Sequence, residues 1–211
     1  MTTANESSET LHSFLERLSS AAPTPGGGAV AALSGALAAA LAHMVASLTA
    51  GKKKFVAVEA EFQAAMPGLK AAIARFTTLM DDDARAFDGV MAAMKLPKAT
   101  PEEAAARDQT LRLATLAAAE APMETLRLLQ SLLPAVELAA AKGNPHAVSD
   151  AGMAALLVTC ATRAAAMNVM INLKALPPAD AAPLRRELDE RTAATLDTAE
   201  RIASRVESTL K

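Results

Sequence analysis

The chain carries no Asp, Glu, Lys or Arg between Leu18 and Gly51, and this run limits the folds open to it more than any other feature. It begins with a turn rich in proline and glycine that ends in Gly26-Gly27-Gly28, and it continues as an alanine-rich segment. Alanine is the strongest helix former, so the segment predicts a buried helix. The glycines remove side chains where another group must approach the backbone, and the first N–H groups of a helix have no partner within it. We interpret the turn and the helix start as a binding site.

Length and composition exclude several classes of protein. The 211 residues suit one domain, 1–211, with a sizeable core. A net charge of -2, from 21 basic and 23 acidic residues, gives no field for a nucleic-acid backbone, and only five Phe, with no Trp or Tyr, are available to stack on bases. We therefore expect no nucleic-acid partner. The single cysteine, Cys160, excludes an intramolecular disulfide; its apolar neighbours predict a small core residue in a reducing, cytoplasmic setting.

The stretch from Gly28 to Ala50 is long enough to raise the question of a membrane span. It is rich in alanine, contains Ser34, His43 and Ser47, and has no flanking belt of aromatic residues. The residues before it are acidic and lack the basic start of a signal peptide. We expect a core helix and no membrane partner.

The pattern along the chain predicts an all-α fold, because runs of β-branched residues with period-two alternation are missing. Thr100-Pro101-Glu102-Glu103 has the residues of a capping box with proline in the first turn. Pro67 predicts a kink or a break, and Pro122 and Pro134 predict that their helix bends or splits. We expect a single-domain bundle of long, alanine-rich antiparallel helices over about 9–19, 28–49, 56–94, 101–141, 147–173 and 183–210, with helix 147–173 buried on all sides.

Asp83 lies where an apolar residue is expected. The apolar seam of helix 56–94 is formed by residues three or four positions apart: Ile73, Phe76, Met80, Phe87, Val90 and Met94. A carboxylate on this seam is costly unless it is paired, hydrogen-bonded or facing a site that needs it. Two interpretations remain: Asp83 is functional, or the seam is partly open and Asp83 faces water or pairs with Arg or Lys. Asp81 and Asp82 lie off the seam, where we expect solvated side chains.

Helix 147–173 contains further polar residues in apolar company. Asp150 follows Ser149 at its start, where an aspartate caps the helix or serves as a second functional carboxylate. Asn168 and Asn172 are one turn apart, and hydrogen bonds between helices are the simpler explanation for them.

The triplet Lys52-Lys53-Lys54 follows the uncharged helix directly. Two of these lysines are explained by the negative end of the helix dipole; a third, at the mouth of a pocket, would bind a ligand carboxylate or transfer protons. His12, His43 and His146 are too scattered, without cysteine support, to form a zinc site. The glycine run lacks the Gly-Lys-Ser/Thr ending of a phosphate-binding loop. We therefore expect no metal, and the pattern gives little support to a nucleotide site.

Four blocks of sequence, in this order, resemble the formiminotransferase-cyclodeaminase C-terminal family. They are residues 23–32 (PTPGGGAVAA), 44–55 (MVASLTAGKKKF), 82–87 (DDARAF) and 143–152 (GNPHAVSDAG). The similarity continues through residues 166–172 (AMNVMIN) and covers nearly the whole chain. The proline-glycine block and the Ser-Asp-x-Gly block are the most specific. Two positions depart from the pattern: Ala29 stands where Ser is frequent, and Pro145-His146 replaces an apolar-Asn pair, so we assign no ligand contact near His146.

The resemblance implies an all-helical, usually dimeric, folate-binding fold, found in formiminotetrahydrofolate cyclodeaminases and methenyltetrahydrofolate cyclohydrolases. The chain looks most like bacterial cyclohydrolases, including the connector 96–103 (LPKATPEE). This implies a folate substrate, a homodimer, and no metal or other cofactor. The expected catalytic residues are Asp83, Asp150 and Lys54, and the expected substrate-binding residues are Pro25, Gly26, Gly27, Gly28, Lys52, Lys53, Ser149 and Asn168.

Hydrolysis of a methenyl bridge requires water to add to an amidinium carbon and a proton to reach the leaving nitrogen. A carboxylate beside the cationic bridge stabilises it and accepts the proton of the water. The sequence leaves open whether Asp83 or Asp150 does this while the other holds the pterin amino group. In the alternative cyclodeaminase reaction, N10 attacks the formimino carbon and ammonia leaves from the same site. A competing hypothesis is a non-catalytic helical assembly module, in which both aspartates are caps or ion-pair partners.

Overall fold

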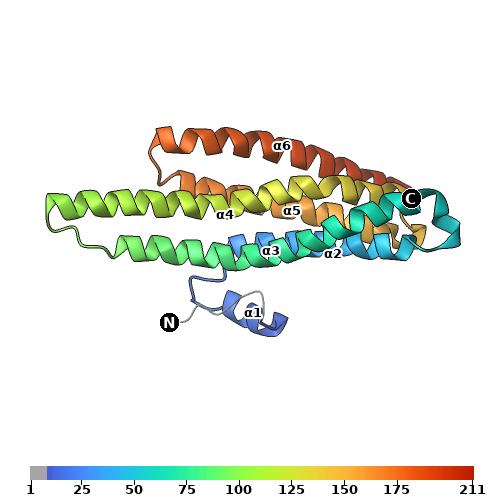
Figure 1. The fold of residues 1–211 in the computed structure, drawn as a ribbon, viewed down its shortest axis with the longest axis horizontal. Coiled ribbons are helices and arrows are strands. Elements are labelled where there is room, and N and C mark those ends of the chain that lie inside the picture. The colour runs from blue at the N-terminus through green and yellow to red at the C-terminus, as the bar shows by residue number, and fades with distance from the viewer. Residues whose placement is uncertain (1–8) are drawn as a thin grey trace.

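The computed structural model describes residues 9–211, and every regular element in this part of the chain is a helix. In chain order the elements are α1 (Leu11–Leu18), α2 (Gly27–Thr49), the 3-10 helix η2 (Lys53–Val58), α3 (Glu59–Met94), α4 (Pro101–Lys142), the 3-10 helix η3 (Pro145–Ala147), α5 (Val148–Leu173) and α6 (Pro178–Thr209). Helices α2 to α6 run along one long axis with alternating direction, and α1 lies beside them near the start of α2 (Figure 1). The predicted all-α bundle of long antiparallel helices is confirmed.

Helix α4 begins as its sequence predicts. The Glu103 N–H donates to Thr100 Oγ1 at 3.2 Å, and the Glu103 carboxylate accepts the Thr100 N–H at 3.3 Å. This reciprocal pair satisfies two amides that a helix start would leave without partners. The local signal therefore fixes the first residue of the longest helix.

The prolines do not divide the long helices. Pro67 lies within the continuous α3, and Pro122 and Pro134 lie within the continuous α4, so the prediction of a split is wrong. An internal proline removes one backbone hydrogen bond and costs about 3 kcal/mol in an isolated helix. In α4 the neighbouring side chains Met123 and Leu126 are fully buried, and their packing holds the helix together through the proline.

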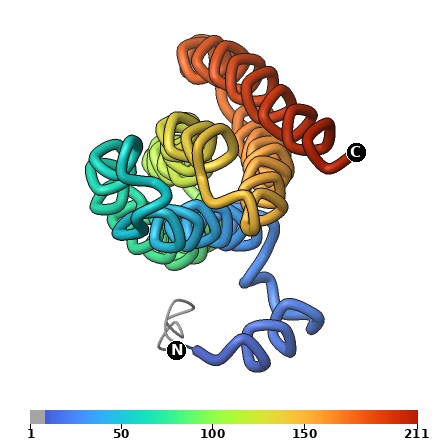
Figure 2. Tube along the Cα trace, turned by 90° about the vertical axis from the view of Figure 1, so that its right-hand side faces the viewer, coloured from blue at the N-terminus to red at the C-terminus, as the bar shows by residue number. Residues whose placement is uncertain are grey.

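Helix α2 packs against α3, α4 and α5. Its inward residues are small: Ala32, Ala38, Ala39 and Ala42 have no exposed surface. A methyl group at Gly35 would approach the ring of Phe76 to 2.6 Å. Figure 2, a view turned by 90°, shows α6 on the far side of the bundle from α1. The alanine-rich composition thus serves close approach between helices.

Helix α5 is buried on one side only, so the prediction of burial on all sides is wrong. Leu156, Met167 and Ile171 expose between 49% and 62% of their surface, and Cys160 is exposed rather than part of the core. The other side of α5 packs against α2, α4 and α6. An apolar composition alone does not distinguish helix residues that are buried in the core from apolar residues on an exposed side of the helix.

By length and composition alone, α2 and the segment Pro145–Leu173 would pass for membrane spans. In the bundle, 56% of the apolar window of α2 and 44% of that of the second segment are buried. A core helix of a helical bundle shows the same property, so two such helices give little support to a membrane span.

The antiparallel arrangement of α2 and α5 gives the bundle two different ends. At the glycine end, defined by Gly26–Gly28, the start of α2 meets the last turns of α5 and the middle of α3. At the lysine end, defined by Lys52–Lys54, the Asn144 N–H donates to Thr49 Oγ1 at 2.9 Å and ties the start of α5 to the end of α2. The hairpin of α3 and α4 extends beyond the glycine end (Figure 1).

Candidate functional site

Asp83 projects from the middle of α3 onto the start of α2. Its carboxylate accepts a hydrogen bond from the Ala29 N–H. The N-cap residue Gly26 supplies no side-chain cap, so Asp83 takes the place of a capping residue from a neighbouring helix. A methyl group at Gly28 would lie 2.0 Å from Asp83 Oδ1, so only glycine admits the carboxylate here. The helix start interpreted as a binding site therefore already holds a carboxylate of the chain itself.

The charge of Asp83 is held in an unfavourable setting. Burial raises the pKa of the Asp83 carboxyl above its ordinary value, and the hydrogen bond from Ala29 opposes part of that increase. No ion pair to Asp83 is present in residues 9–211. The interpretation that Asp83 pairs with an Arg or Lys is therefore wrong for this part of the chain. The adjacent Asp82 instead pairs with Arg75 at 2.8 Å and with Arg85. Asp83 thus has the environment of a functional carboxylate.

A cleft of about 320 Å³ opens at Asp83. One wall comes from the glycine turn and the start of α2, a second from α3 and a third from α5, with one residue of α4. Its lining residues are Pro23, Thr24, Gly26, Gly27, Gly28, Asp83, Phe87, Val90, Ala118, Asn168, Ile171 and Asn172. The size suits a compact heterocycle, and the wall combines apolar surface with a few convergent polar groups.

Two asparagines of α5 give the cleft hydrogen-bonding capacity. Asn168 Nδ2 donates to the Ala164 carbonyl at 2.9 Å, and Asn172 Nδ2 donates to the Ala118 carbonyl of α4 at 3.0 Å. The predicted bond between helices is confirmed for Asn172, whereas Asn168 bonds within its own helix. Because both amide nitrogens are engaged with backbone, the carbonyl oxygens are the groups left to accept from a ligand.

The predicted site residues fall into two groups. Gly26, Gly27, Gly28, Asp83 and Asn168 line the same cleft, while Pro25 is buried beside it and is not part of the lining.

The second group lies at the lysine end. The Lys52–Lys54 segment and Ser149 are exposed there, and Asp150 lies in the first turn of α5. Since the 23 residues of α2 span roughly 35 Å, Asp83 and Asp150 of one chain do not meet.

Several residues of the cleft escaped prediction as site residues. Phe87 and Val90 continue the apolar seam of α3, and Ile171 has the same character as the other apolar residues of α5. Asn172 was noticed only as a polar partner of Asn168. These residues share one feature: they lie on a helix face beyond the point where the neighbouring helix α2 begins. Recognising them as site residues requires knowledge of how the helices pack.

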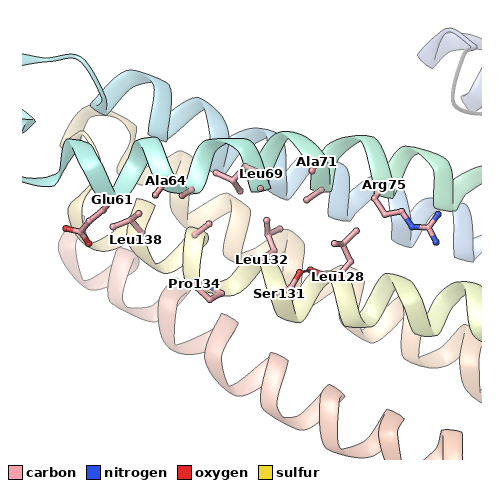
Figure 3. Close-up of a pocket in the computed structure, with 14 residues that line it drawn as sticks. Glu61, Ala64, Leu69, Ala71, Arg75, Leu128, Ser131, Leu132, Pro134 and Leu138 are labelled. Atoms are coloured by element: carbon pink, nitrogen blue, oxygen red, sulfur yellow. Dashed lines mark hydrogen bonds between the residues drawn. The ribbon is translucent and has the colours of Figure 1, made fainter.

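A larger hollow of about 600 Å³ lies between α3 and α4. Figure 3 shows its wall of alanine and leucine side chains, with Glu61 and Arg75 at opposite ends. Both charged groups are already paired: Glu61 accepts from Lys142 Nζ at 2.7 Å, and Arg75 donates to Asp82 at 2.8 Å. No set of polar groups converges in this hollow, so the smaller cleft at Asp83 is the better candidate for chemistry.

Within residues 9–211, no group of three or more His, Cys, Asp or Glu side chains is placed to hold a metal ion. The cleft offers one carboxylate, two amides and backbone groups. The fold and this cleft define an all-helical bundle protein with a half-buried carboxylate set against a glycine-rich helix start.

Comparison with known proteins agrees with this class. Residues 10–191 match the family described as formiminotransferase-cyclodeaminase. The methenyltetrahydrofolate cyclohydrolase of Methylorubrum extorquens is 44% identical over 168 residues, which are 80% of this chain and 81% of that protein. The formimidoyltransferase-cyclodeaminase of Sus scrofa is 38% identical over 164 residues, but these make up only 30% of that longer protein.

A solved structure extends the similarity to three dimensions. The formiminotetrahydrofolate cyclodeaminase from Thermotoga maritima superposes with a TM-score of 0.86 at 31% identity, covering 97% of this chain and 98% of that one. The chain belongs to the formiminotransferase-cyclodeaminase family.

Proposed function

We propose that this protein hydrolyses 5,10-methenyltetrahydrofolate to 10-formyltetrahydrofolate in one-carbon metabolism. The proposal rests on one observation above all: a carboxylate with a raised pKa, Asp83, faces a cleft of heterocycle size at a helix start built from glycines. The 44% identity to a methenyltetrahydrofolate cyclohydrolase over most of both chains supports this substrate.

Asp83 is the proposed catalytic base. The methenyl bridge is a cationic amidinium, so a carboxylate beside it stabilises the bound substrate and keeps its own charge. Water adds to the cationic bridge carbon and gives one proton to Asp83, which leaves a neutral hydroxyl adduct. The bond from this carbon to N5 then breaks as Asp83 passes its proton to N5. The hydroxyl group of the adduct loses its proton to solvent and becomes the formyl carbonyl on N10, so the reaction releases one proton in total and Asp83 ends in its ionised form.

The neighbouring groups have proposed binding roles. The carbonyl oxygens of Asn168 and Asn172 accept hydrogen bonds from the amino and ring N–H groups of the pterin, since their own nitrogens are engaged. Phe87 packs against the planar ring, and Gly26 to Gly28 let the ring lie against the backbone. No metal or separate cofactor takes part in this scheme.

A cyclodeaminase is the second candidate, favoured by the similarity to the Thermotoga maritima enzyme. In that reaction N10 attacks the formimino carbon of 5-formiminotetrahydrofolate, and the protonated amine leaves as ammonia. Asp83, as the protonated acid, would supply this proton, so the same cleft serves either direction of proton transfer.

The deciding experiment follows two reactions with the purified chain. Enzyme-dependent loss of the methenyl chromophore, corrected for spontaneous hydrolysis and without ammonia from the formimino substrate, supports the cyclohydrolase. Ammonia release with accumulation of the chromophore supports the cyclodeaminase instead. No rate in either assay from folded protein, together with no saturable folate binding, would refute both and favour the assembly module.

We also propose a homodimer acting in the cytoplasm. Size-exclusion chromatography with light scattering tests the first statement, and cell fractionation tests the second. Lys54 and Asp150, predicted as catalytic, and Lys52, Lys53 and Ser149, predicted as binding residues, enter this scheme only through a second copy of the chain, because the length of α2 separates them from Asp83.

A further inference from the structure

Thr24 brings to the Asp83 cleft a hydroxyl group that the proposed mechanism leaves unused. The residue lines the cleft from the glycine turn, and it is half-buried. Within residues 9–211, nothing forms a hydrogen bond with this hydroxyl. By contrast, the hydroxyls of Thr77 and Thr115 donate to the carbonyl groups four residues earlier in their helices, at 2.7 and 2.8 Å. The Thr24 hydroxyl is therefore available to a ligand or to water.

The turn holds Thr24 in a stiff segment. Pro23 and Pro25 flank it, and each proline ring fixes its own φ angle, while a residue before proline has few backbone conformations open to it. Pro25 is buried, and the next residue, Gly26, is the N-cap of α2. Branching at Cβ also restricts χ1 of the threonine. The hydroxyl therefore loses little conformational entropy when it binds another group.

Thr24 lies at the boundary between exposed and buried chain. Residues 21–23 before it are exposed, and Pro25 after it is buried. The Asp83 carboxylate lies against Gly28, which is buried in the first turn of α2. The hydroxyl thus has exposed chain on one side and the carboxylate site on the other, as a group that contacts both solvent and a reacting water requires.

The other polar side chains of the cleft have acceptors to offer but no free donor. In the described chain, four lining residues carry polar side chains: Thr24, Asp83, Asn168 and Asn172. Both asparagine nitrogens donate to backbone carbonyls, which leaves their oxygens as acceptors, and an ionised carboxylate only accepts. Of these four, Thr24 alone has both a free donor and a free acceptor.

Hydrolysis of the methenyl bridge requires two acceptors for the attacking water. The water directs a lone pair at the bridge carbon, so both of its O–H groups point away from that carbon. Asp83 takes one proton. The other O–H becomes the hydroxyl of the adduct, and its proton is the one that finally reaches solvent. A second acceptor on this O–H fixes the orientation of the water and stabilises the positive charge that develops on its oxygen.

We propose that Thr24 is a second catalytic residue, whose hydroxyl oxygen accepts a hydrogen bond from the attacking water and orients it toward the bridge carbon. This inference rests on the proposed function, because it requires a methenyl bridge in the cleft. When the bond from the bridge carbon to N5 breaks, the proton of the adduct hydroxyl passes to Thr24 Oγ1, while the Thr24 proton passes to a solvent water. Each turnover thus releases one proton and leaves Thr24 unchanged.

The role is specific to hydrolysis. Cyclodeamination consumes no water, because N10 of the substrate is the nucleophile and ammonia is the leaving group. Thr24 therefore favours water as the nucleophile in a cleft whose base serves either reaction. This makes Thr24 a residue that determines which of the two reactions the cleft catalyses well.

An isosteric substitution tests the role of the hydroxyl. Thr24→Val keeps the shape and the branching of the side chain and removes the hydroxyl. In the decay of the methenyl chromophore, kcat is expected to fall by about 10- to 100-fold while KM stays within about 2-fold of wild type. Thr24→Ser restores a hydroxyl and is expected to recover kcat to within about 3-fold of wild type. Circular dichroism verifies that each variant is folded.

Thr78→Val is the matched control. Thr78 is exposed on α3, lies outside the cleft, and donates to the Ala74 carbonyl at 3.1 Å. The same hydroxyl is removed, so wild-type kcat is expected. A loss of kcat in Thr78→Val equal to that in Thr24→Val would overturn the inference.

Two further measurements distinguish a hydroxyl that orients water from one that binds the folate or only shapes the turn. 5-Methyltetrahydrofolate has the ring system and the tail but no bridge to hydrolyse, and Thr24→Val is expected to bind it with the wild-type Kd. Weaker binding with unchanged kcat would assign Thr24 to the folate and overturn the inference. The acidic limb of the pH profile is expected to stay in place, because Asp83 remains the base; a shifted limb would show that valine disturbs Asp83, and would also overturn it.

The outcomes separate this inference from the proposed function. If wild type hydrolyses the methenyl bridge and Thr24→Val is equally active, the inference is wrong and the proposed function stands. If Thr24→Ser is as inactive as Thr24→Val, the hydroxyl is not what matters, and the inference is again wrong. If wild type does not hydrolyse the bridge at all, both fail.

Discussion

Replacing Gly28 by alanine is a sharp test of how the site is built. The added methyl carbon would lie 2.0 Å from Asp83 Oδ1 and 2.3 Å from its Cγ, whereas carbon contacts in proteins are not found below 3.0 Å. The carboxylate must therefore move by about 1 Å or more and give up the hydrogen bond from the Ala29 N–H. Gly28 is therefore predicted to matter because its lack of a side chain leaves room for the Asp83 carboxylate.

The magnitude follows from two terms. A hydrogen bond to a charged group contributes about 1.5–3 kcal/mol, and an alanine in a helix recovers at most about 1 kcal/mol relative to glycine. We expect Gly28→Ala to lower the free energy of unfolding by about 1–2 kcal/mol. A catalytic group displaced by about 1 Å costs on the order of 100-fold, so we expect a 10- to 100-fold loss in kcat/KM.

The assay is the decay of the methenyl chromophore, with urea unfolding measured on the same samples. Gly89→Ala is the control, because this exposed glycine of α3 has no atom within 4 Å of the added methyl. It is expected to keep full activity and to gain up to about 1 kcal/mol of stability. Gly28→Ala with wild-type kcat/KM would refute the placement of Asp83 as the base.

Four further predictions concern charge and capping. Asp83→Asn is expected to lower kcat/KM by about 10²- to 10⁴-fold, because the variant has no base. It is also expected to raise the melting temperature at pH 7, because burial makes the ionised carboxylate unfavourable in the folded protein. A variant that loses both activity and stability would contradict this. For the same reason, wild-type kcat/KM should fall with decreasing pH through a pKa above 3.8, and a profile flat down to pH 4 would oppose it. Hydrogen bonds from Arg127 lower the pKa of Glu187 from 4.5 to about 2. This pair therefore stabilises the fold above pH 4.5, and the stabilisation is lost as the pH falls from 4.5 to 2. In urea unfolding, Glu187→Gln should lower the free energy of unfolding by about 1 kcal/mol at pH 7, after allowance for solvent screening, and by nothing at pH 2. Thr100→Ala should cost about 1 kcal/mol by removing the side-chain half of the capping box, and Ser131→Ala, which removes only a hydroxyl bonded to the Leu128 carbonyl at an exposed site, serves as its control.

Local signals in the sequence were sufficient for the helices and for half of the site. The capping box at Thr100 depends on neighbouring residues alone, and it is confirmed. Asp83 stood out because a carboxylate interrupted an apolar seam, and the glycines stood out because they precede a buried helix. These patterns are short-range, so the sequence contains them in full.

The relation between the two ends of the bundle was not accessible in this way. Lys54 and Asp150 were grouped with Asp83 by chemistry, but their separation depends on the direction and length of α2 and α5. The outward side of α5 was equally hidden, since Cys160 and Met167 have the same character whether a core or another surface covers them. The sequence also left open whether the prolines of α4 bend or split the helix, because long-range packing, which keeps α4 continuous, outweighs their local cost.

Alanine residues line the side of α2 that faces the core, and they set an upper limit on the volume of the side chains at these positions. Replacing a leucine of α4 such as Leu129 by alanine leaves a cavity and costs about 2–5 kcal/mol, as in most protein cores. At Ala38 or Ala39 there is almost nothing to remove, whereas every larger residue must push α3 or α5 away. Substitutions on the inward side of α2 therefore destabilise the bundle by enlarging a side chain and not by removing one. A displacement of α2 also moves the glycine-rich helix start against which Asp83 packs.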